Sequence, residues 1–198
     1  MDLKRLLAVS SLNLNENQIR QVDKYIDQIL KWNRTRNLVS RKLTKNDLAE
    51  HFLDCAVLQK HLLPGPVIDL GSGSGFPGIC LGIIDPNREL TLVDSNRKKT
   101  SFLIHVKNEL GLNLVSVKNA RVEEIEQINE TNIVCRAFKE PADLLNILEN
   151  KITKNNKIIL MVSEEEALSS PNFDIEYKES EASKILEKKR GFLEIQMS

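Results

Sequence analysis

The chain has 198 residues, 28% of them charged, and its formal net charge is zero. This length suits one well-buried α/β domain with a small extension and excludes two full domains. A chain without net charge has no global field that draws it to nucleic acid or to a membrane, so any basic surface must be local. The apolar run at residues 6–9 is too short for a signal peptide, and no stretch approaches a membrane span. We therefore expect a cytoplasmic protein.

Two amphipathic helices are predicted before the first strand. Asn15 can cap a helix, and apolar residues then recur at steps of three and four through about Trp32. Thr44 marks a second helix start, again followed by one apolar face. We assign residues 1–63 to an N-terminal helical extension and residues 64–198 to the main domain.

A basic stretch joins these two helices. Residues 31–45 contain lysines and arginines, among them Arg34 and Arg36, with no acid between them. One interpretation is an edge that contacts phosphates, with Trp32 available to stack. The other is a solvated linker whose tryptophan packs inward, and the residues alone favour it because charge runs usually face water.

The most informative segment is a strand that passes into a glycine-rich turn. Residues 67–70 form an apolar run with one acid, and Gly71, Gly73 and Gly75 follow at every second position. Glycine at such positions permits positive φ and close approach of a ligand to the backbone. Pro77 suits the first turn of a helix, whose free N–H groups would point at a polar or anionic ligand. The sequence thus predicts a ligand-binding loop, with a tight turn without ligand as the alternative.

Two cofactors compete for this loop. Gly73, Gly75 and Gly78 have the spacing of a dinucleotide fingerprint, and Asp94 lies near the distance expected for an acid on ribose hydroxyls. Asp69, however, favours S-adenosylmethionine, because the pattern Asp-x-Gly-x-Gly-x-Gly resembles the first motif of Rossmann-type methyltransferases. A carboxylate there can reach the ammonium group of that cofactor or order a water beside it, whereas it would repel a pyrophosphate.

Strand and helix patterns alternate after the loop. Strands are predicted at residues 90–94, 114–117, 133–135 and 157–162, helices from Asn96 and Pro141, and a closing antiparallel pair at 173–177 and 192–197. Such alternation implies a parallel sheet covered on both faces. The predicted fold is α/β: a Rossmann-like methyltransferase with a mostly parallel, doubly wound sheet and an N-terminal helical extension. Three widely separated cysteines (Cys55, Cys80 and Cys135) lack metal or redox spacing, so we predict reduced core residues and no metal site.

Several local patterns together resemble one family, the ribosomal RNA small subunit methyltransferase G family, also called the glucose-inhibited division protein B family. The patterns are Trp32-Asn33, Asn37-Leu38, His51-x-x-Asp54, residues 69–79 with their Phe-Pro-Gly, Val93-Asp94-Ser95, Lys98-Lys99, Phe102-Leu103, residues 121–124 and Arg136-Ala137-Phe138. The match covers a little over half of the chain. Departures occur at Glu50, Cys55 and Val162-Ser163, on segments expected to face the substrate.

The resemblance implies methyl transfer from S-adenosyl-L-methionine to N7 of a guanosine in small-subunit (16S) ribosomal RNA. Guanine N7 carries an in-plane lone pair and no hydrogen, so no general base is required and no catalytic residue is predicted. The contribution expected of the enzyme is alignment of the reacting atoms and exclusion of water. The expected partner is the RNA or the small ribosomal subunit, without a membrane, and we expect a monomer.

The residues and the resemblance together predict a cofactor site formed by Asp69, Gly71, Gly73, Gly75, Phe76, Asp94, Val122, Glu123 and Arg136. The glycines would take the methionine end of the cofactor, with Phe76 shaping the wall. Asp94 would accept ribose hydroxyls, and Val122 and Glu123 match the adenine-contacting pair of the family. Arg136 would clamp the cofactor carboxylate or an RNA phosphate.

Structural alternatives exist for each charged residue of this set. They are a helix cap for Asp94, a helix-start charge for Glu123, and for Arg136 an ion pair with Glu123 or Glu124. His51 and Asp54 share a helix face, either as a packed pair or as a base contact.

RNA contacts are predicted at Arg34, Arg36, Arg97, Lys98 and Lys99, and the alternative for the last three is that their side chains are merely solvated. Three functional alternatives remain open. They are an NAD(P)-dependent oxidoreductase, a methyltransferase of a small molecule, and an RNA-binding module that holds the cofactor without catalysis.

Overall fold

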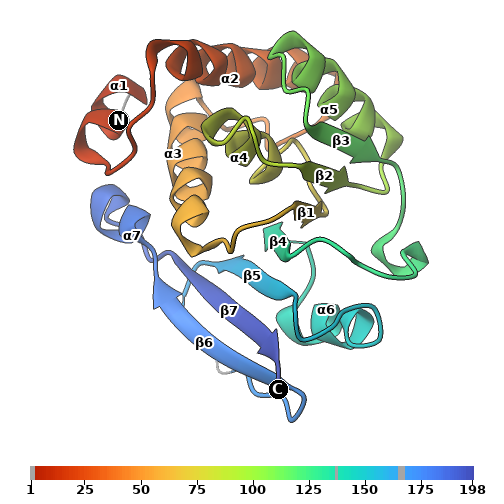
Figure 1. Ribbon diagram of the computed structural model, residues 1–198. Coiled ribbons are helices and arrows are strands. Elements are labelled where there is room, and N and C mark those ends of the chain that lie inside the picture. The colour runs from red at the N-terminus through yellow and green to blue at the C-terminus, as the bar shows by residue number, and fades with distance from the viewer. Residues whose placement is uncertain (1–2, 137, 165–167) are drawn as a thin grey trace.

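The computed structural model describes residues 3–136, 138–164 and 168–198. Within these ranges the centre is one sheet of seven strands in the order β3, β2, β1, β4, β5, β7, β6 (Figure 1). The strands are β1 (Val67–Leu70), β2 (Leu90–Val93), β3 (Val115–Lys118), β4 (Asn132–Arg136), β5 (Lys157–Val162), β6 (Phe173–Glu179) and β7 (Gly191–Met197). Strands β1 to β5 are parallel, whereas β7 is antiparallel to β5 and to β6. The predicted parallel sheet and its closing antiparallel pair are confirmed.

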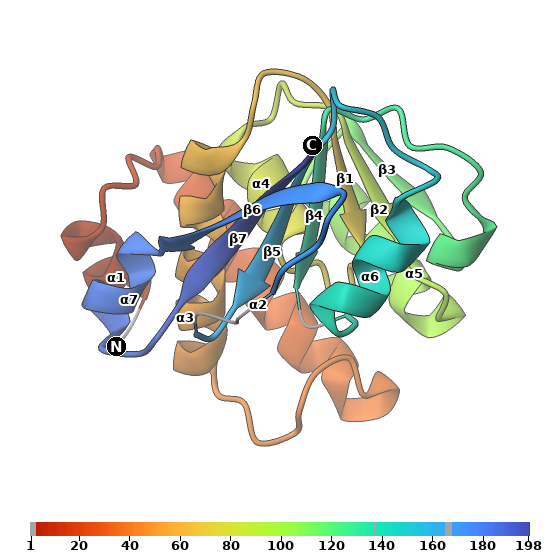
Figure 2. The same ribbon diagram turned by 90° about the horizontal axis from the view of Figure 1, so that it is seen from below.

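Helices cover both faces of the sheet, unequally (Figures 1 and 2). Several helices share a buried cluster on one face, among them α1 (Leu3–Val9), α2 (Glu16–Arg36), α3 (Lys45–Ala56), α4 (Gly78–Ile84) and α5 (Arg97–Glu109). The other face is covered by α6 (Pro141–Leu148) and the 3-10 turn η2 (Val122–Glu124). The 3-10 turn η1 (Val57–His61) follows α3, and α7 (Glu181–Leu186) lies beside α1. Among the described helices, none has the length and apolar character that crossing a bilayer requires.

Side-chain capping fixes where the N-terminal helices begin. The Asn15 side chain accepts a hydrogen bond from the Gln18 backbone N–H, and the Gln18 side chain accepts one from the Asn15 N–H. Thr44 and Asp47 form the same reciprocal arrangement at the start of α3. Both predicted helix starts are confirmed, because this arrangement satisfies N–H groups that a helix leaves free. Helix α2 runs beyond Trp32 to Arg36, whereas α1 and α7 were not predicted.

Alternate residues of the strands face opposite layers. Ile133 and Cys135 of β4 pack with Leu144 of α6, and Val134 packs on the other face with the N-terminal helices. All three cysteines are buried and free, as predicted. Because α2 and α3 share a buried cluster with β1, β2 and α4, the division between residues 1–63 and 64–198 does not coincide with a gap in the core. That division stays a prediction.

Candidate active site

The site lies where the strand order reverses, between β1 and β4. In parallel sheets a ligand binds outside the carboxyl ends of the strands at such a switch point. The chain leaves β1 through Gly71 and Ser72, whose backbone N–H groups both donate to the carbonyl oxygen of Val93, at 2.9 and 3.0 Å. The glycine loop is therefore anchored to the end of β2.

The three glycines of the loop have positive φ values of 74° at Gly71, 60° at Gly73 and 100° at Gly75, which confirms the predicted backbone conformation. A Cβ atom on Gly71 would lie 2.3 Å from the ring of Phe138, and one on Gly75 would lie 2.5 Å from Ile79. A Cβ on Gly73 would meet nothing closer than the Gly71 carbonyl oxygen at 3.8 Å. Gly71 and Gly75 thus serve packing, whereas Gly73 faces open space that a ligand can enter.

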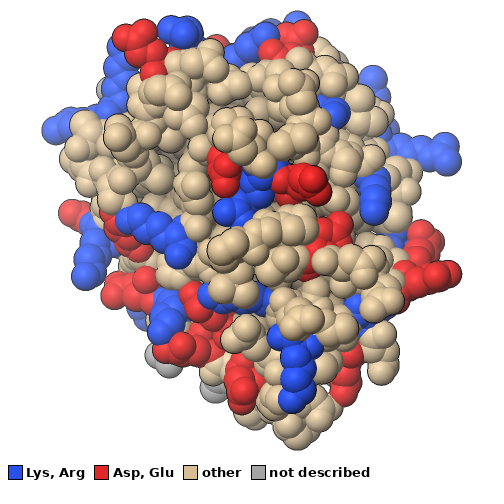
Figure 3. Space-filling view, in the orientation of Figure 1, with Lys and Arg blue, Asp and Glu red and all other residues tan. Residues whose placement is uncertain are grey.

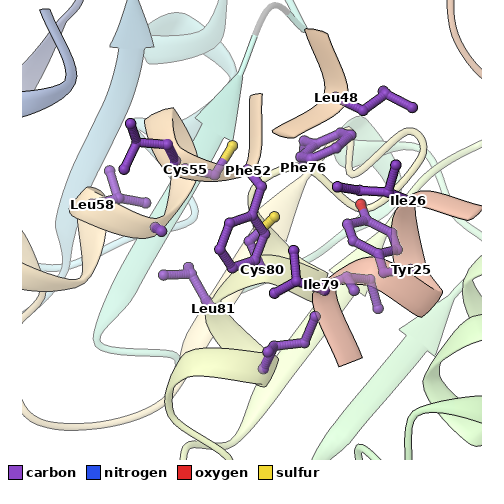
Figure 4. Close-up of a cluster of buried hydrophobic side chains, with 14 of the residues drawn as sticks. Tyr25, Ile26, Leu48, Phe52, Cys55, Leu58, Phe76, Ile79, Cys80 and Leu81 are labelled. Carbon is purple, nitrogen blue, oxygen red and sulfur yellow. The ribbon is translucent and has the colours of Figure 1, made fainter. Parts of the chain in front are cut away.

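Helix α2 supports this loop from below (Figure 4). The buried Tyr25 hydroxyl donates a hydrogen bond of 2.8 Å to the carbonyl oxygen of Ser74. The rings of Tyr25 and Phe76 lie 5.3 Å apart, and His51 meets Phe76 edge to face at 5.7 Å. Sequence reasoning missed Tyr25, because its place in the apolar stripe of α2 gave no signal for its hydroxyl. Phe76 packs against α2 and α3 here, so any effect on a cofactor would be exerted through the loop.

Asp69 lies fully buried beneath the loop. Its Oδ2 accepts a hydrogen bond of 2.9 Å from the Gly78 backbone N–H. Its Oδ1 is buried and has no hydrogen-bond partner among the described residues. Burial raises the pKa of Asp69 to about 7, although the hydrogen bond from Gly78 opposes the shift. The unpaired oxygen can accept a hydrogen bond from an ammonium group or from a water.

Asp94 joins the glycine loop to the start of α5. Its Oδ2 accepts from the Gly73 N–H at 2.9 Å and its Oδ1 from the Asn96 N–H at 2.8 Å. The cap of α5 itself is Asn96, whose side chain accepts from the Lys98 N–H. The helix-cap alternative for Asp94 is therefore only partly right, because the same carboxylate also holds Gly73.

Four predicted residues meet at one cavity of about 130 Å³, which we call the β2 cavity. They are Gly71, Asp94, Val122 and Glu123. The Glu123 carboxylate lies 3.0 Å from Lys139 Nζ. A hydrogen bond from its own backbone N–H, together with Lys139, lowers the pKa of Glu123. The volume is below the roughly 300–1,000 Å³ of complete ligand pockets, so the β2 cavity would enclose one end of a cofactor.

Arg136 lines a second, larger cavity of about 370 Å³ over the ends of β4 and β5, which we call the β4–β5 cavity. Its NH2 lies 3.7 Å from Oδ2 of Asp54 in α3, and Arg190 Nε lies 3.4 Å from the same oxygen. The partner of Arg136 is thus Asp54 and not Glu123 or Glu124. Sequence reasoning missed Arg190, which precedes β7 and reaches the site only through the antiparallel return of the chain. The two cavities share Lys139.

His51 is neutral in this setting. Burial, with Arg136 and Arg190 nearby, lowers its pKa to about 4.

The residues that depart from the family pattern lie near the site. Cys55 Sγ lies 3.5 Å from the Arg136 guanidinium, and Glu50 forms an ion pair with Lys188. Val162 and Ser163 line the β4–β5 cavity, and Ala137 lies outside the described residues.

The predicted RNA-contacting residues lie at the ends of two antiparallel helices. Gln21 of α2 bonds to Leu110 at the end of α5, whereas Trp32 packs on Phe102 near its start, with ring centroids 5.5 Å apart. The C-terminal end of α2 and the N-terminal end of α5 therefore lie together. Exposed residues at these ends are Arg34, Arg36, Arg97 and Lys98, and Lys99 is half-buried. The linker interpretation predicted that Trp32 packs inward, and this is confirmed. The Arg36 guanidinium lies over the same ring, with its carbon 5.7 Å from the ring centroid.

Figure 3 shows basic and acidic side chains interspersed over the face of the molecule drawn in Figure 1. This agrees with a net charge of zero, and any attraction to RNA would come from local groups.

A family model described as GidB, rRNA small subunit methyltransferase G, matches residues 18–194. The chain belongs to this family. A ribosomal RNA small subunit methyltransferase G of Francisella philomiragia is 32% identical over 177 residues, covering 88% of this chain and 86% of the relative. The protein of the same name from Chromobacterium violaceum is 35% identical over 162 residues, covering 81% and 78%. That of Nitrosomonas europaea is 43% identical over a shorter stretch of 116 residues, 58% and 54%.

Solved structures show the same fold at low sequence identity. A mutant of MtNAS in complex with S-adenosylmethionine has a TM-score of 0.62 at 14% identity, covering 92% of this chain and 72% of that chain. A ribosomal protein L11 methylase from Lactobacillus delbrueckii subsp. bulgaricus has a TM-score of 0.58 at 15% identity, covering 76% and 79%. The predicted Rossmann-like methyltransferase fold is confirmed.

Membership of the methyltransferase G family makes the chain an rRNA methyltransferase whose methyl donor is S-adenosyl-L-methionine. The residues present fit that cofactor. Gly73 leaves open space above the loop, and Asp69 has an unpaired buried oxygen that suits an ammonium group or a water. Asp94 keeps lone pairs beyond those that bind Gly73 and Asn96.

Proposed function

We propose that the protein methylates N7 of a guanosine in small-subunit ribosomal RNA. The observation that carries the proposal is the pair of adjoining cavities at the carboxyl edge of the sheet, in a member of the methyltransferase G family. The β2 cavity would take the adenosine end of S-adenosylmethionine, with Asp94 on the ribose and Val122 and Glu123 beside the adenine. The β4–β5 cavity, at about 370 Å³, is large enough for a base.

The reaction needs no side chain that acts as an acid or a base. S-adenosylmethionine supplies an electrophilic methyl group on a sulfonium, and guanine N7 supplies a lone pair without losing a proton. The work of this chain is to hold the two reactants in line and to exclude water. The backbone of Gly71, Gly73 and Gly75 would position the methionine end, with Asp69 toward its ammonium group. Arg136 would neutralise the cofactor carboxylate or an RNA phosphate.

The RNA would be held outside the two cavities. Exposed and half-buried cations at the joined ends of α2 and α5 lie at the carboxyl edge of the sheet, where they can contact phosphates. They are Arg34, Arg36, Arg97, Lys98 and Lys99. We propose that the protein acts as a cytoplasmic monomer on the RNA or on the small ribosomal subunit, with residues 1–63 as the extension that supports RNA binding.

The test incubates the protein with methyl-labelled S-adenosylmethionine and small-subunit RNA, or particles, from cells that lack the enzyme. We expect label as N7-methylguanosine at one mapped position. Label on a small molecule from the same cells, and none on RNA, would support the small-molecule alternative. Binding of cofactor and RNA without transfer would indicate a non-catalytic module. Membership of the methyltransferase family disfavours the nicotinamide alternative, which predicts binding of NAD(P) and tolerance of substitutions at Asp69.

A further inference from the structure

A buried carboxylate, that of Asp54, lines the β4–β5 cavity. Its side chain is 6% exposed, and it is the shared partner of Arg136 and Arg190. Neither ion pair is short: the nitrogen-to-oxygen distances are 3.7 and 3.4 Å, against about 2.9 Å for a direct N–H···O hydrogen bond. The two arginines therefore compensate the charge of Asp54 while its oxygens keep the capacity to accept hydrogen bonds.

The rest of the cavity combines apolar and polar lining, which suits a planar base with polar edges. Leu144, Leu160 and Met161 supply apolar wall, and the cavity is also lined by polar and charged side chains, namely Asp54, Arg136, Lys139, Glu140, Ser163 and Arg190. Apolar side chains can pack against the faces of a planar base, and polar groups can pair with its edges. The cavity volume of about 370 Å³ lies within the roughly 300–1,000 Å³ range of ligand pockets.

We propose that the β4–β5 cavity holds the target guanine, and that Asp54 recognises the base by accepting hydrogen bonds from its N1–H and its exocyclic amino group. This inference rests on the function proposed above and adds the residue that reads the base. The amino group and N1–H lie on the Watson–Crick edge of guanine, whereas N7 lies on the other ring. A carboxylate bound to the first edge leaves N7 free toward the methyl donor.

The same carboxylate would reject adenine, although adenine also has an N7. The Watson–Crick edge of adenine presents a lone pair at N1, which would face the charged oxygens of Asp54 without a proton between them. An unpaired charge in a buried site is costly, and sites built on a hydrogen bond discriminate strongly against analogues that lack it. Arg136 and Arg190, which flank Asp54, favour its ionised form, although burial raises its pKa.

The test replaces the target guanosine, at the position mapped in the labelling experiment, with inosine or adenosine in RNA assembled by ligation. Inosine lacks only the exocyclic amino group. With the unsubstituted protein we expect kcat/KM to fall about 10- to 100-fold on inosine, because one hydrogen bond to a charged acceptor is lost. With Asp54→Ala we expect slow transfer that is equal, within about twofold, on guanosine and inosine.

A second variant separates recognition from folding. Asp54→Asn keeps the size of the side chain and presents one acceptor and one donor, which complement adenine. We expect Asp54→Asn to gain transfer to adenosine at the target position relative to guanosine. The matched control is Asp85→Asn, which removes an aspartate paired with Arg88 at 3.0 Å, at the opposite edge of the sheet. Its preference among the three bases should not change.

Three outcomes would overturn the inference. Equal transfer to guanosine and inosine by the unsubstituted protein would show that the amino group is not read. An equal loss on both bases in Asp54→Ala, with the guanosine preference kept, would reduce Asp54 to a positioning residue. A large loss of S-adenosylmethionine affinity in both variants by calorimetry would place Asp54 at the cofactor. If the unsubstituted protein methylates no guanosine in small-subunit RNA, the proposed function itself fails. That result differs from the three above, in which guanosine is still methylated and only the role of Asp54 is refuted.

Discussion

Asp94 is the residue on which the geometry of the β2 cavity depends most directly. Because its two oxygens hold the backbone of Gly73 and Asn96, we expect Asp94→Ala both to lose the proposed ribose contact and to release the loop. Cofactor affinity should fall at least about tenfold, and label transfer should be lost at ordinary cofactor concentrations. Calorimetry measures the affinity. Asp94→Asn, which keeps one acceptor, should be intermediate, and an unchanged affinity in Asp94→Ala would remove Asp94 from the site.

Asp69 makes folding stability depend on pH. Its pKa is about 7 when folded, against an ordinary value of 3.8. Below about pH 4 the carboxyl is protonated in both states, and from there to about pH 7 only the unfolded state releases the proton. Stability from this group is therefore greatest at low pH and is lost as the pH rises through that window.

The variant Asp69→Asn cannot ionise and keeps an oxygen for the Gly78 N–H. We expect its free energy of unfolding to exceed that of the unsubstituted protein by an amount that grows between about pH 4 and pH 7. Urea unfolding at several pH values measures the difference. We also expect weaker cofactor binding, because the charge toward the ammonium group is gone. A stability difference that does not vary with pH would contradict the raised pKa.

At the scale of elements, helix α2 is bound to the glycine loop by one buried hydroxyl. Tyr25→Phe keeps the ring that packs on Phe76 and leaves the Ser74 carbonyl oxygen without its donor. We expect a cost of about 1–3 kcal/mol, seen as a fall in Tm of about 2–4 °C for each kcal/mol, and weaker cofactor binding. Calorimetric scans with and without cofactor test this. A loss of stability with full cofactor affinity would show that the loop holds its shape without α2.

The cations at the joined ends of α2 and α5 are predicted to contact RNA phosphates. Reversing both Arg34 and Arg36 to glutamate should weaken RNA binding and flatten its salt dependence, because fewer counterions are released when fewer phosphates are neutralised. The slope of log K against log salt should fall by about one to two. The control is the double variant in which Arg20 and Lys154, which are also exposed, are replaced by glutamate, because it changes the net charge by the same amount. If the slope of log K against log salt is the same in both double variants, residues 31–45 are a solvated linker and do not contact phosphates.

At the scale of the whole molecule, the N-terminal helices and the sheet share one core. Because α2, α3 and α4 bury their apolar residues in the same cluster, we expect one cooperative unfolding transition, with equal calorimetric and van't Hoff enthalpies. A chain that lacks residues 1–63 should expose the apolar face of α4 and fail to give that transition. Two separate transitions in the full chain would contradict this.

The sequence predicted most of the elements because their signals are local. Asn15 and Thr44 mark helix starts by capping, and short runs of apolar residues marked the strands from β1 to β5. Positive φ at Gly73 followed from glycine spacing next to a buried strand. Such signals need no knowledge of what lies opposite in space.

What the sequence did not predict depends on long-range packing. Tyr25 and Ser74 are neighbours only once α2 lies under the loop, and Asp54 meets Arg190 only once β7 has returned to β5. The structural alternative for Arg136, an ion pair with Glu123 or Glu124, names the wrong partners for the same reason, because the pair is with Asp54. No spacing along the chain encodes such contacts, so the conformation of the glycine loop was predictable and the second cavity was not.

The place of β7 in the sheet has a consequence for biosynthesis. β7 inserts between β5 and β6, and Arg190, just before it, lines the cavity over β4 and β5. Until translation has passed Met197, β5 has no partner on that side and the guanidinium of Arg190 is not held in position. The residues that anchor the glycine loop, in α2 and at the end of β2, therefore emerge from the ribosome early, whereas the β4–β5 cavity can be completed only after β7 has emerged and paired with β5.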